Sequence, residues 1–124
     1  MKKILIVEDN TDIRRLIRMT LELEDVHIIE ASNGERGLAA AIEERPDVVL
    51  LDVMMPDGID GIELCRRIKA DASLGSTKIV MLSARSAAAD VELATAAGAH
   101  AYLAKPFSPL QLIQVVAGLA FATT

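Results

Sequence analysis

The stretch VVLLDVMMP, residues 48–56, places four aliphatic residues directly before the carboxylate of Asp52. A short continuous apolar run that is rich in β-branched residues is typical of a strand buried on both faces, and Pro56 prevents such a strand from continuing. The sequence therefore predicts that Asp52 lies at the end of a central strand. An aspartate there can also simply begin a loop by hydrogen bonding to its own backbone, so this stretch alone assigns no chemical role.

Other strand-like runs also end in chemically useful side chains. The runs and the groups that follow them are residues 4–7 before Glu8 and Asp9, residues 79–82 before Ser83, and residues 101–103 shortly before Lys105. Because all strands of an open parallel sheet point the same way, their carboxyl ends converge on one edge, where ligand sites lie. We therefore expect three acids, a hydroxyl and a lysine to share one crevice.

The period of the hydrophobic pattern alternates along the chain between that of a strand and that of a helix. Strands are predicted near residues 3–7, 26–30, 47–52, 78–82 and 100–103, with a helical stretch after each of them. This alternation indicates an α/β protein with a parallel sheet covered by helices on both faces. The length of 124 residues suits one domain, and with no linker or repeat visible we expect a single domain over residues 1–124.

Composition excludes several classes of function. The net charge of -5 and the pI of about 5.0 argue against direct binding of nucleic acid, since such surfaces carry clustered Lys and Arg. The apolar run at the start is too short for a signal peptide, and the uncharged C-terminal stretch is broken by prolines and glutamines, which disfavours a membrane span. The single cysteine, Cys65, allows no internal disulfide, so we expect a cytoplasmic protein.

Five short motifs follow the ends of the predicted strands. Together they resemble the receiver domain of two-component response regulators. The motifs are Glu8-Asp9, Asp52 with Met55-Pro56, Asp60-Gly61, Ser83-Ala84 and Lys105-Pro106. The resemblance runs from Lys2 to about Val116 and is nearest to stand-alone, chemotaxis-type receivers. It implies a flavodoxin-like three-layer sandwich with a five-stranded sheet in the order 2-1-3-4-5 and five helices, an order that the pattern alone does not give.

The resemblance also implies a chemistry. Asp52 would accept a phosphoryl group from a sensor histidine kinase or a histidine phosphotransfer protein. Mg²⁺, or Mn²⁺, would be held by Asp9, Asp52 and the carbonyl of Met54, with Glu8 acting directly or through water. On this view the chain is a signalling switch, not an enzyme, that assists its own phosphorylation and dephosphorylation.

Four further residues have roles that the resemblance implies. Lys105 and Ser83 would each contact a phosphoryl oxygen, and Ala84 would leave room beside them. Tyr102 would turn inward when Ser83 moves, which would reshape the face formed by the fourth helix, the fifth strand and the fifth helix. One departure from the family pattern lies between Pro56 and Gly61, where this chain has one residue more, so we expect the loop after Asp52 to differ in shape from that of the family.

The helices suggest where partners bind. In the first helix an apolar face is predicted for Ile13, Leu16, Ile17 and Thr20, and the arginines opposite, Arg14, Arg15 and Arg18, are candidate contacts for the kinase. In the second helix Leu38, Ala41 and Ile42 are predicted to face inward.

The last helix begins with a capping box at residues 108–111, and the chain carries no charged side chain from Pro106 onward. Leu110 and Phe121 are expected beside its buried stripe, and the small residues 87–89 are expected to keep the fourth helix flat. We therefore expect Pro106, Leu110 and Phe121 to contact a downstream effector or a second copy of the chain.

Three alternatives remain. A Mg²⁺-dependent phosphohydrolase that uses an aspartyl phosphate often places an acid two residues after its nucleophile, and here that residue is Met54. A nucleotide or flavin binder of the same fold would need a glycine-rich loop after the first strand, where this chain has Asp9-Asn10-Thr11-Asp12. A receiver that acts only as a scaffold would have no need of the complete set of acids.

Overall fold

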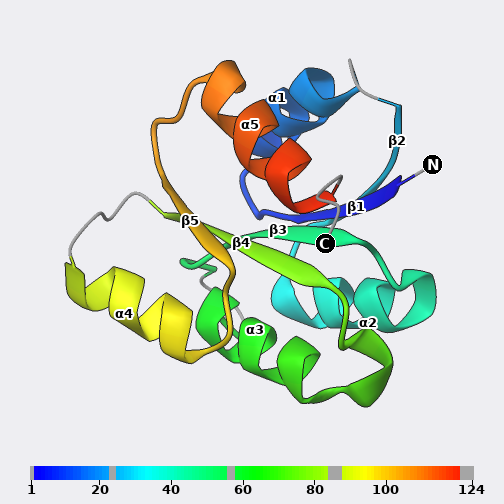
Figure 1. Cartoon of the computed structure of the whole chain (residues 1–124), viewed down its shortest axis with the longest axis vertical. Helices are drawn as coiled ribbons and strands as arrows, with labels where there is room; N and C mark the ends of the chain where they lie inside the picture. Colours follow the sequence, from blue (N-terminus) through cyan, green and yellow to red (C-terminus); the bar gives the residue numbers. More distant parts are fainter. Residues whose placement is uncertain (1, 23–24, 56–57, 84–87, 121–124) are drawn as a thin grey trace.

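The computed structural model describes residues 2–22, 25–55, 58–83 and 88–120, with the side chains of residues 88–90 and 120 not described. Strands and helices alternate along the chain, as the sequence predicts (Figure 1). In order they are β1 (Lys2–Val7), α1 (Thr11–Leu21), β2 (Val26–Ala31), α2 (Gly34–Glu44), β3 (Val48–Asp52), α3 (Gly61–Ala70), a short 3-10 helix η1 (Ala72–Leu74), β4 (Lys78–Ser83), α4 (Ala88–Ala96), β5 (Ala101–Ala104) and α5 (Pro109–Ala120).

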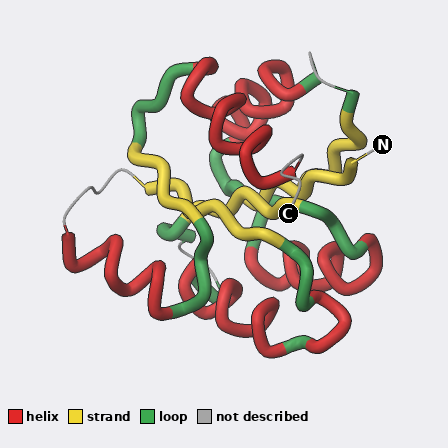
Figure 2. Tube along the Cα trace, viewed as in Figure 1, coloured by secondary structure: helices red, strands yellow, loops and turns green. Residues whose placement is uncertain are grey.

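The described strands form one sheet in the order β2-β1-β3-β4-β5, and every neighbouring pair is parallel. Figure 1 shows α1 and α5 above the sheet and α2, α3 and α4 below it, and the loops in Figure 2 join the strands to these two layers. The flavodoxin-like three-layer architecture and the strand order are therefore confirmed. The central strand β3 is buried along its whole length.

Side chains alternate between the two faces of the sheet, and each face has its own core. On the side of α1 and α5 the buried strand residues are Ile4, Ile6, Val48, Leu50, Val80, Leu82 and Leu103. On the side of α2, α3 and α4 they are Leu5, Val7, Ala31, Val49, Leu51, Ile79 and Met81. The same alternation continues to the strand ends, so it decides on which face each functional side chain lies.

The helices begin where polar side chains cap their free N–H groups. Asn10, Asn33 and Asp60 each accept a hydrogen bond from the backbone N–H three residues later, at 3.0, 2.8 and 2.8 Å. The predicted capping box of α5 is confirmed. Gln111 N–H donates to Ser108 Oγ at 3.1 Å, and Ser108 N–H donates back to Gln111 Oε1 at 2.9 Å.

Two predictions about helix faces are wrong in part. Leu16 is 50% exposed, because α1 buries Ile17, Thr20 and Leu21 and its inner face is therefore rotated away from Leu16. Ile42 is 48% exposed, because α2 approaches the sheet through the small residues Gly34, Gly37 and Ala41, and Ile42 lies at the edge of that face. In the part of the chain that the structure describes, every helix is too short or too polar to cross a membrane.

His100, directly before β5, forms two hydrogen bonds with Ile79 of β4. Ile79 N–H donates to His100 Nδ1 at 3.1 Å, and His100 N–H donates to the Ile79 carbonyl at 2.8 Å. Because Nδ1 accepts a hydrogen bond, this arrangement needs the neutral imidazole. Partial burial, and then the nearby Lys69 and Lys78, lower the pKa of His100 below its ordinary value.

This lowered pKa predicts a pH dependence of stability. The unfolded chain, with an ordinary histidine pKa of about 6.5, takes up the proton first, so the stabilising contribution is complete above that pH and is lost as the pH falls through it. We expect His100→Ala to reduce the decline in the free energy of unfolding between about pH 7.5 and 5.5, as measured by urea denaturation. His27→Ala, a change in an exposed residue of β2, should leave that decline as in the wild type.

Candidate functional site

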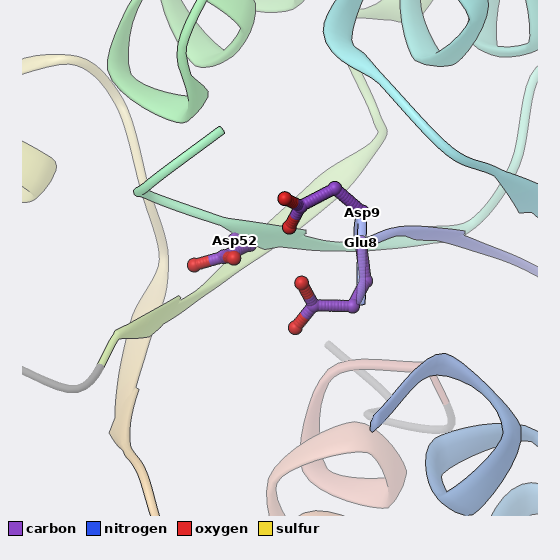
Figure 3. A group of neighbouring side chains, drawn as sticks. All are labelled: Glu8, Asp9 and Asp52. Carbon is purple, nitrogen blue, oxygen red and sulfur yellow. The ribbon is translucent and has the colours of Figure 1, made fainter. Parts of the chain in front are cut away.

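Three carboxylates meet at the carboxyl ends of β1 and β3. Each of Glu8, Asp9 and Asp52 offers an oxygen, and these oxygens lie within 4.8 Å of one another. Figure 3 shows Glu8 and Asp9 coming from the end of β1 and Asp52 from the end of β3. Glu8 and Asp52 are buried and Asp9 is exposed, so the cluster opens to solvent on one side.

The ammonium group of Lys105 lies inside this cluster. Lys105 Nζ is 2.6 Å from Glu8 Oε1 and 3.5 Å from Asp52 Oδ2. Lys105 follows β5, whose end is tied to β4 because Lys105 N–H donates to the Ser83 carbonyl at 2.7 Å. The peptide bond between Lys105 and Pro106 is cis. The predicted convergence of Glu8, Asp9, Asp52 and Lys105 at one edge is therefore present.

Burial and neighbouring acids raise the pKa values of Glu8 and Asp9. Burial has the largest effect on the pKa of Glu8, and the neighbouring Asp52 raises it further, while Lys105 acts in the opposite direction. The pKa of Asp9 is also raised, first by partial burial and then by Glu8. The site thus holds more negative charge than its own lysine neutralises, which favours a divalent cation.

The backbone around the acids is fixed by hydrogen bonds. Met54 N–H donates to Asp52 Oδ1 at 3.1 Å, and Asn10 N–H donates to Glu8 Oε2 at 3.3 Å. A hollow of about 310 Å³ lies over the acids, lined by Glu8, Asp9, Asn10, Ile13, Asp52, Met54 and Lys105. Hard oxygen donors beside a hollow of this size fit Mg²⁺ or Mn²⁺.

Two of the three predicted docking arginines make contacts within the chain. Arg14 Nη1 donates to the Glu8 carbonyl at 2.7 Å and Arg14 Nε to Glu30 at 3.2 Å, whereas Arg18 bonds Glu30 at 2.6 Å and Glu22 at 2.8 Å. Arg14 therefore holds the backbone of the acidic pair against β2. Arg15 is exposed.

A second, apolar hollow adjoins the acids. It has a volume of about 300 Å³ and is lined by Ile13, Leu16, Lys105, Pro106 and Phe107. It shares Ile13 and Lys105 with the hollow over the acids. An apolar depression between α1 and the segment before α5 thus lies next to the polar site.

Ser83 lies on β4, the strand next to β3, and Tyr102 lies on β5, the strand beyond it. Ser83 is fully buried and ends β4, one residue beyond Leu82, which is the register partner of Asp52. Tyr102 is half-buried and packs against the core on the side of α2, α3 and α4. It borders a hollow of about 260 Å³ between α4 and β5, whose other lining residues are Val91, Ala94, Thr95, Ala99, His100 and Ala101.

Some predicted residues lie elsewhere. Ala84 and Phe121 fall outside the described residues, as do Pro56 and Ala87. Leu110 is 63% exposed on the first turn of α5, and Pro106 is exposed beside it. Two features of the site were not predicted: the hydrogen bond from Arg14 to the Glu8 carbonyl and the apolar hollow beside Phe107. Nothing in the sequence around Arg14 and Arg15 indicates which of them contacts Glu8. For the hollow, the sequence signal was the aromatic residue directly after Lys105-Pro106.

Comparison with known proteins shows the family to which this arrangement belongs. Residues 4–117 match the family model described as the response regulator receiver domain. The chain therefore belongs to the response regulator receiver domain family, whose members are signalling switches of two-component systems.

Curated relatives of the chain are regulatory proteins about twice its length. The chain is 44% identical over 117 residues to the transcriptional regulatory protein ResD of Bacillus subtilis, covering 94% of this chain and 47% of ResD. It spans about half the length of such curated relatives.

Solved structures of receivers superimpose closely. The chemotaxis protein CheY4 of Vibrio cholerae gives a TM-score of 0.90 at 30% identity, covering 96% of this chain and 98% of CheY4. The receiver domain of the sensor histidine kinase PA1611 from Pseudomonas aeruginosa, described with a magnesium ion coordinated in its active site cleft, gives 0.89 at 28% identity and covers 98% of both chains.

The Arg14 contact leads to a prediction about stability. Arg14→Ala removes a hydrogen bond from a charged donor to a partly buried carbonyl, so we expect the free energy of unfolding to fall by about 1–3 kcal/mol. The neighbouring Arg15→Ala makes the same charge change at an exposed position and should alter it by less than about 0.5 kcal/mol. Urea denaturation of the two variants checks this, and equal effects would contradict the anchoring role of Arg14.

Proposed function

We propose that this chain is a phosphorelay switch in which Asp52 accepts one phosphoryl group in a reaction that depends on a divalent cation. The observation that carries the proposal is the meeting of Glu8, Asp9 and Asp52 within 4.8 Å, with Lys105 Nζ at 3.5 Å from Asp52, in a member of the receiver family. The donor would be a sensor histidine kinase or a histidine phosphotransfer protein.

The metal would be held by Asp9, Asp52 and the Met54 carbonyl, with Glu8 binding directly or through water. The magnesium described in the PA1611 receiver supports this choice. Bound there, the cation would offset the repulsion between the carboxylates and an incoming phosphoryl group.

In the proposed phosphoryl transfer, each residue of the site has a separate role. An oxygen of the Asp52 carboxylate attacks phosphorus, a P–O bond forms, and the P–N bond to the donor histidine breaks, with its electron pair remaining on the imidazole. Met54 N–H holds Asp52 Oδ1 at 3.1 Å, which orients the attacking group. Lys105 supplies positive charge where the phosphoryl oxygens would lie, and Ser83, at the end of the adjacent strand, supplies a hydroxyl.

The alternatives are less well supported. A phosphohydrolase would need an acid at residue 54, and Met54 is 52% exposed there with no proton to give. We therefore propose that the chain is not a hydrolytic enzyme beyond the turnover of its own acyl phosphate.

We also propose that it is cytoplasmic, which the single buried cysteine supports.

The docking surface for the donor is the apolar hollow beside the acids. The two hollows share Ile13 and Lys105, so a partner helix resting on Leu16, Pro106 and Phe107 could present its phosphohistidine to Asp52. Arg15 remains a candidate contact on the exposed side of α1, whereas Arg14 and Arg18 hold β2.

The phosphate is read out through α4, β5 and α5. Contact of Ser83 with the new phosphate would shift the balance between two pre-existing states of the domain, and the hollow beside Tyr102 gives its ring room to move. Exposed Leu93 on α4 and Leu110 on α5 supply apolar surface, and the face would bind a second copy of the chain or an effector.

The phosphorylation site can be tested directly. Treatment with a small phosphodonor and Mg²⁺ should add one phosphoryl group to the wild type, and Asp52→Asn, which keeps the size of the side chain, should accept none. Intact mass spectrometry measures both, and chelation of the metal should abolish the reaction of the wild type. Undiminished labelling of Asp52→Asn would refute the assignment.

The proposed output face, formed by α4, β5 and α5, can be tested by placing a charged residue on it. We expect phosphorylation to promote self-association, and Leu110→Glu to weaken it by about tenfold, the effect of losing one buried leucine from a contact. Ile42→Glu places the same charge on an equally apolar, exposed site of α2, on a different part of the surface (Figure 1), and should have no effect. Sedimentation velocity with and without phosphodonor distinguishes these results; equal association of both variants would exclude this face.

A further inference from the structure

The loop between β3 and α3, which contains the one residue that the family pattern lacks, is held by a side chain from a different part of the fold. Ile59 N–H donates to Glu35 Oε1 at 3.0 Å across 24 residues of sequence. Glu35 stands in the first turn of α2. A carboxylate on the second helix thus reaches the loop that follows the phosphoacceptor.

Two glycines make this approach possible. Gly58 has a φ of 75°, a left-handed conformation that other residues rarely adopt, and a Cβ there would overlap the Glu35 carboxylate. On the opposite side, a Cβ on Gly34 would overlap Ile59. The backbones of α2 and the loop are therefore as close as the absence of both side chains allows.

The loop is also fixed at its two ends. Next to Asp52, Gly61 N–H donates to the Val53 carbonyl at 3.1 Å, and a Cβ on Gly61 would overlap the Asp52 carbonyl. Toward the helix, Asp60 caps α3 by accepting from Glu63 N–H at 2.8 Å. Between these ends, Ile59 packs against the core on the α2 side. The Glu35 bond closes this set of restraints from outside the loop.

We infer that Glu35 is a positioning residue, which holds the β3–α3 loop so that the Met54 carbonyl faces the three acids. The inference rests on the proposed function, because Met54 matters only if that carbonyl is a metal ligand. A hydrogen bond from α2 to Ile59 would restrain a loop that is one residue longer than the family pattern.

The test compares three variants. Glu35→Ala removes the acceptor of the Ile59 N–H bond, Glu35→Gln keeps a side-chain oxygen of the same reach, and Glu43→Ala removes one negative charge at an exposed site in the last turn of the same helix. We expect Glu35→Ala to weaken Mg²⁺ binding about threefold to tenfold, the range for the loss of one hydrogen bond. Glu35→Gln and Glu43→Ala should stay within about twofold of the wild type.

Three measurements distinguish a positioning role of Glu35 from a general loss of folding stability. Isothermal titration with Mg²⁺ gives the affinities, and amide hydrogen exchange of the metal-free proteins reports on Ile59 itself, which should exchange faster in Glu35→Ala than in the other two variants. Urea denaturation should show that all variants unfold in one cooperative transition, with no more loss of stability in Glu35→Ala than one hydrogen bond accounts for.

The outcomes are distinguishable. If the wild type binds Mg²⁺ and Glu35→Ala binds it equally well, or if Glu35→Gln loses as much as Glu35→Ala, the positioning role is wrong while the proposed function stands. If the wild type binds no divalent cation, the proposed function fails, and this inference fails with it.

Discussion

The ion pair between Lys105 and Glu8 is the interaction that allows the site to exist before any ligand binds. A buried carboxylate without a partner is costly, and here Glu8 is fully buried beside a second buried acid, Asp52. The Lys105 ammonium, 2.6 Å from Glu8, offsets much of that cost but cannot offset the charge of all three acids. The arrangement is stable and still favours a cation.

The alternation of side chains along the strands sorts the functional groups between two layers. Glu8 and Asp52 continue the series of Ile6 and Leu50, which faces α1 and α5, whereas Tyr102 packs with the residues that face α3 and α4. In the proposed switch, the phosphoryl group arrives on the first side, where the apolar hollow lies. The response would begin at Tyr102 on the second side, next to α4, and the proposed output surface continues from there around the edge strand β5 to α5 on the first side. In the proposed switch, the β5 edge of the sheet thus connects the two layers.

The parts of this protein that sequence predicts are those that depend on local pattern. Strand ends, helix caps and the convergence of Glu8, Asp52 and Lys105 follow from residues close together in the chain and from the geometry of a parallel sheet. The rotation of α1, which exposes Leu16, depends on packing that one helix cannot reveal. The contacts of Arg14 with Glu30 and of Glu35 with Ile59 join residues 16 and 24 positions apart, on different elements. No periodicity records such pairs, so the anchoring of both loops around the site became visible only in three dimensions.

The absence of charged side chains from Pro106 to Thr124 determines the physical character of any contact made through α5. Ion pairs are weakened by salt, whereas contacts between apolar side chains are not screened. Association through Leu110 and its neighbours should therefore persist at high ionic strength. Its heat capacity change should be negative, and cooling should weaken it. Temperature, more than salt, would then set how strongly this domain responds to the same degree of phosphorylation.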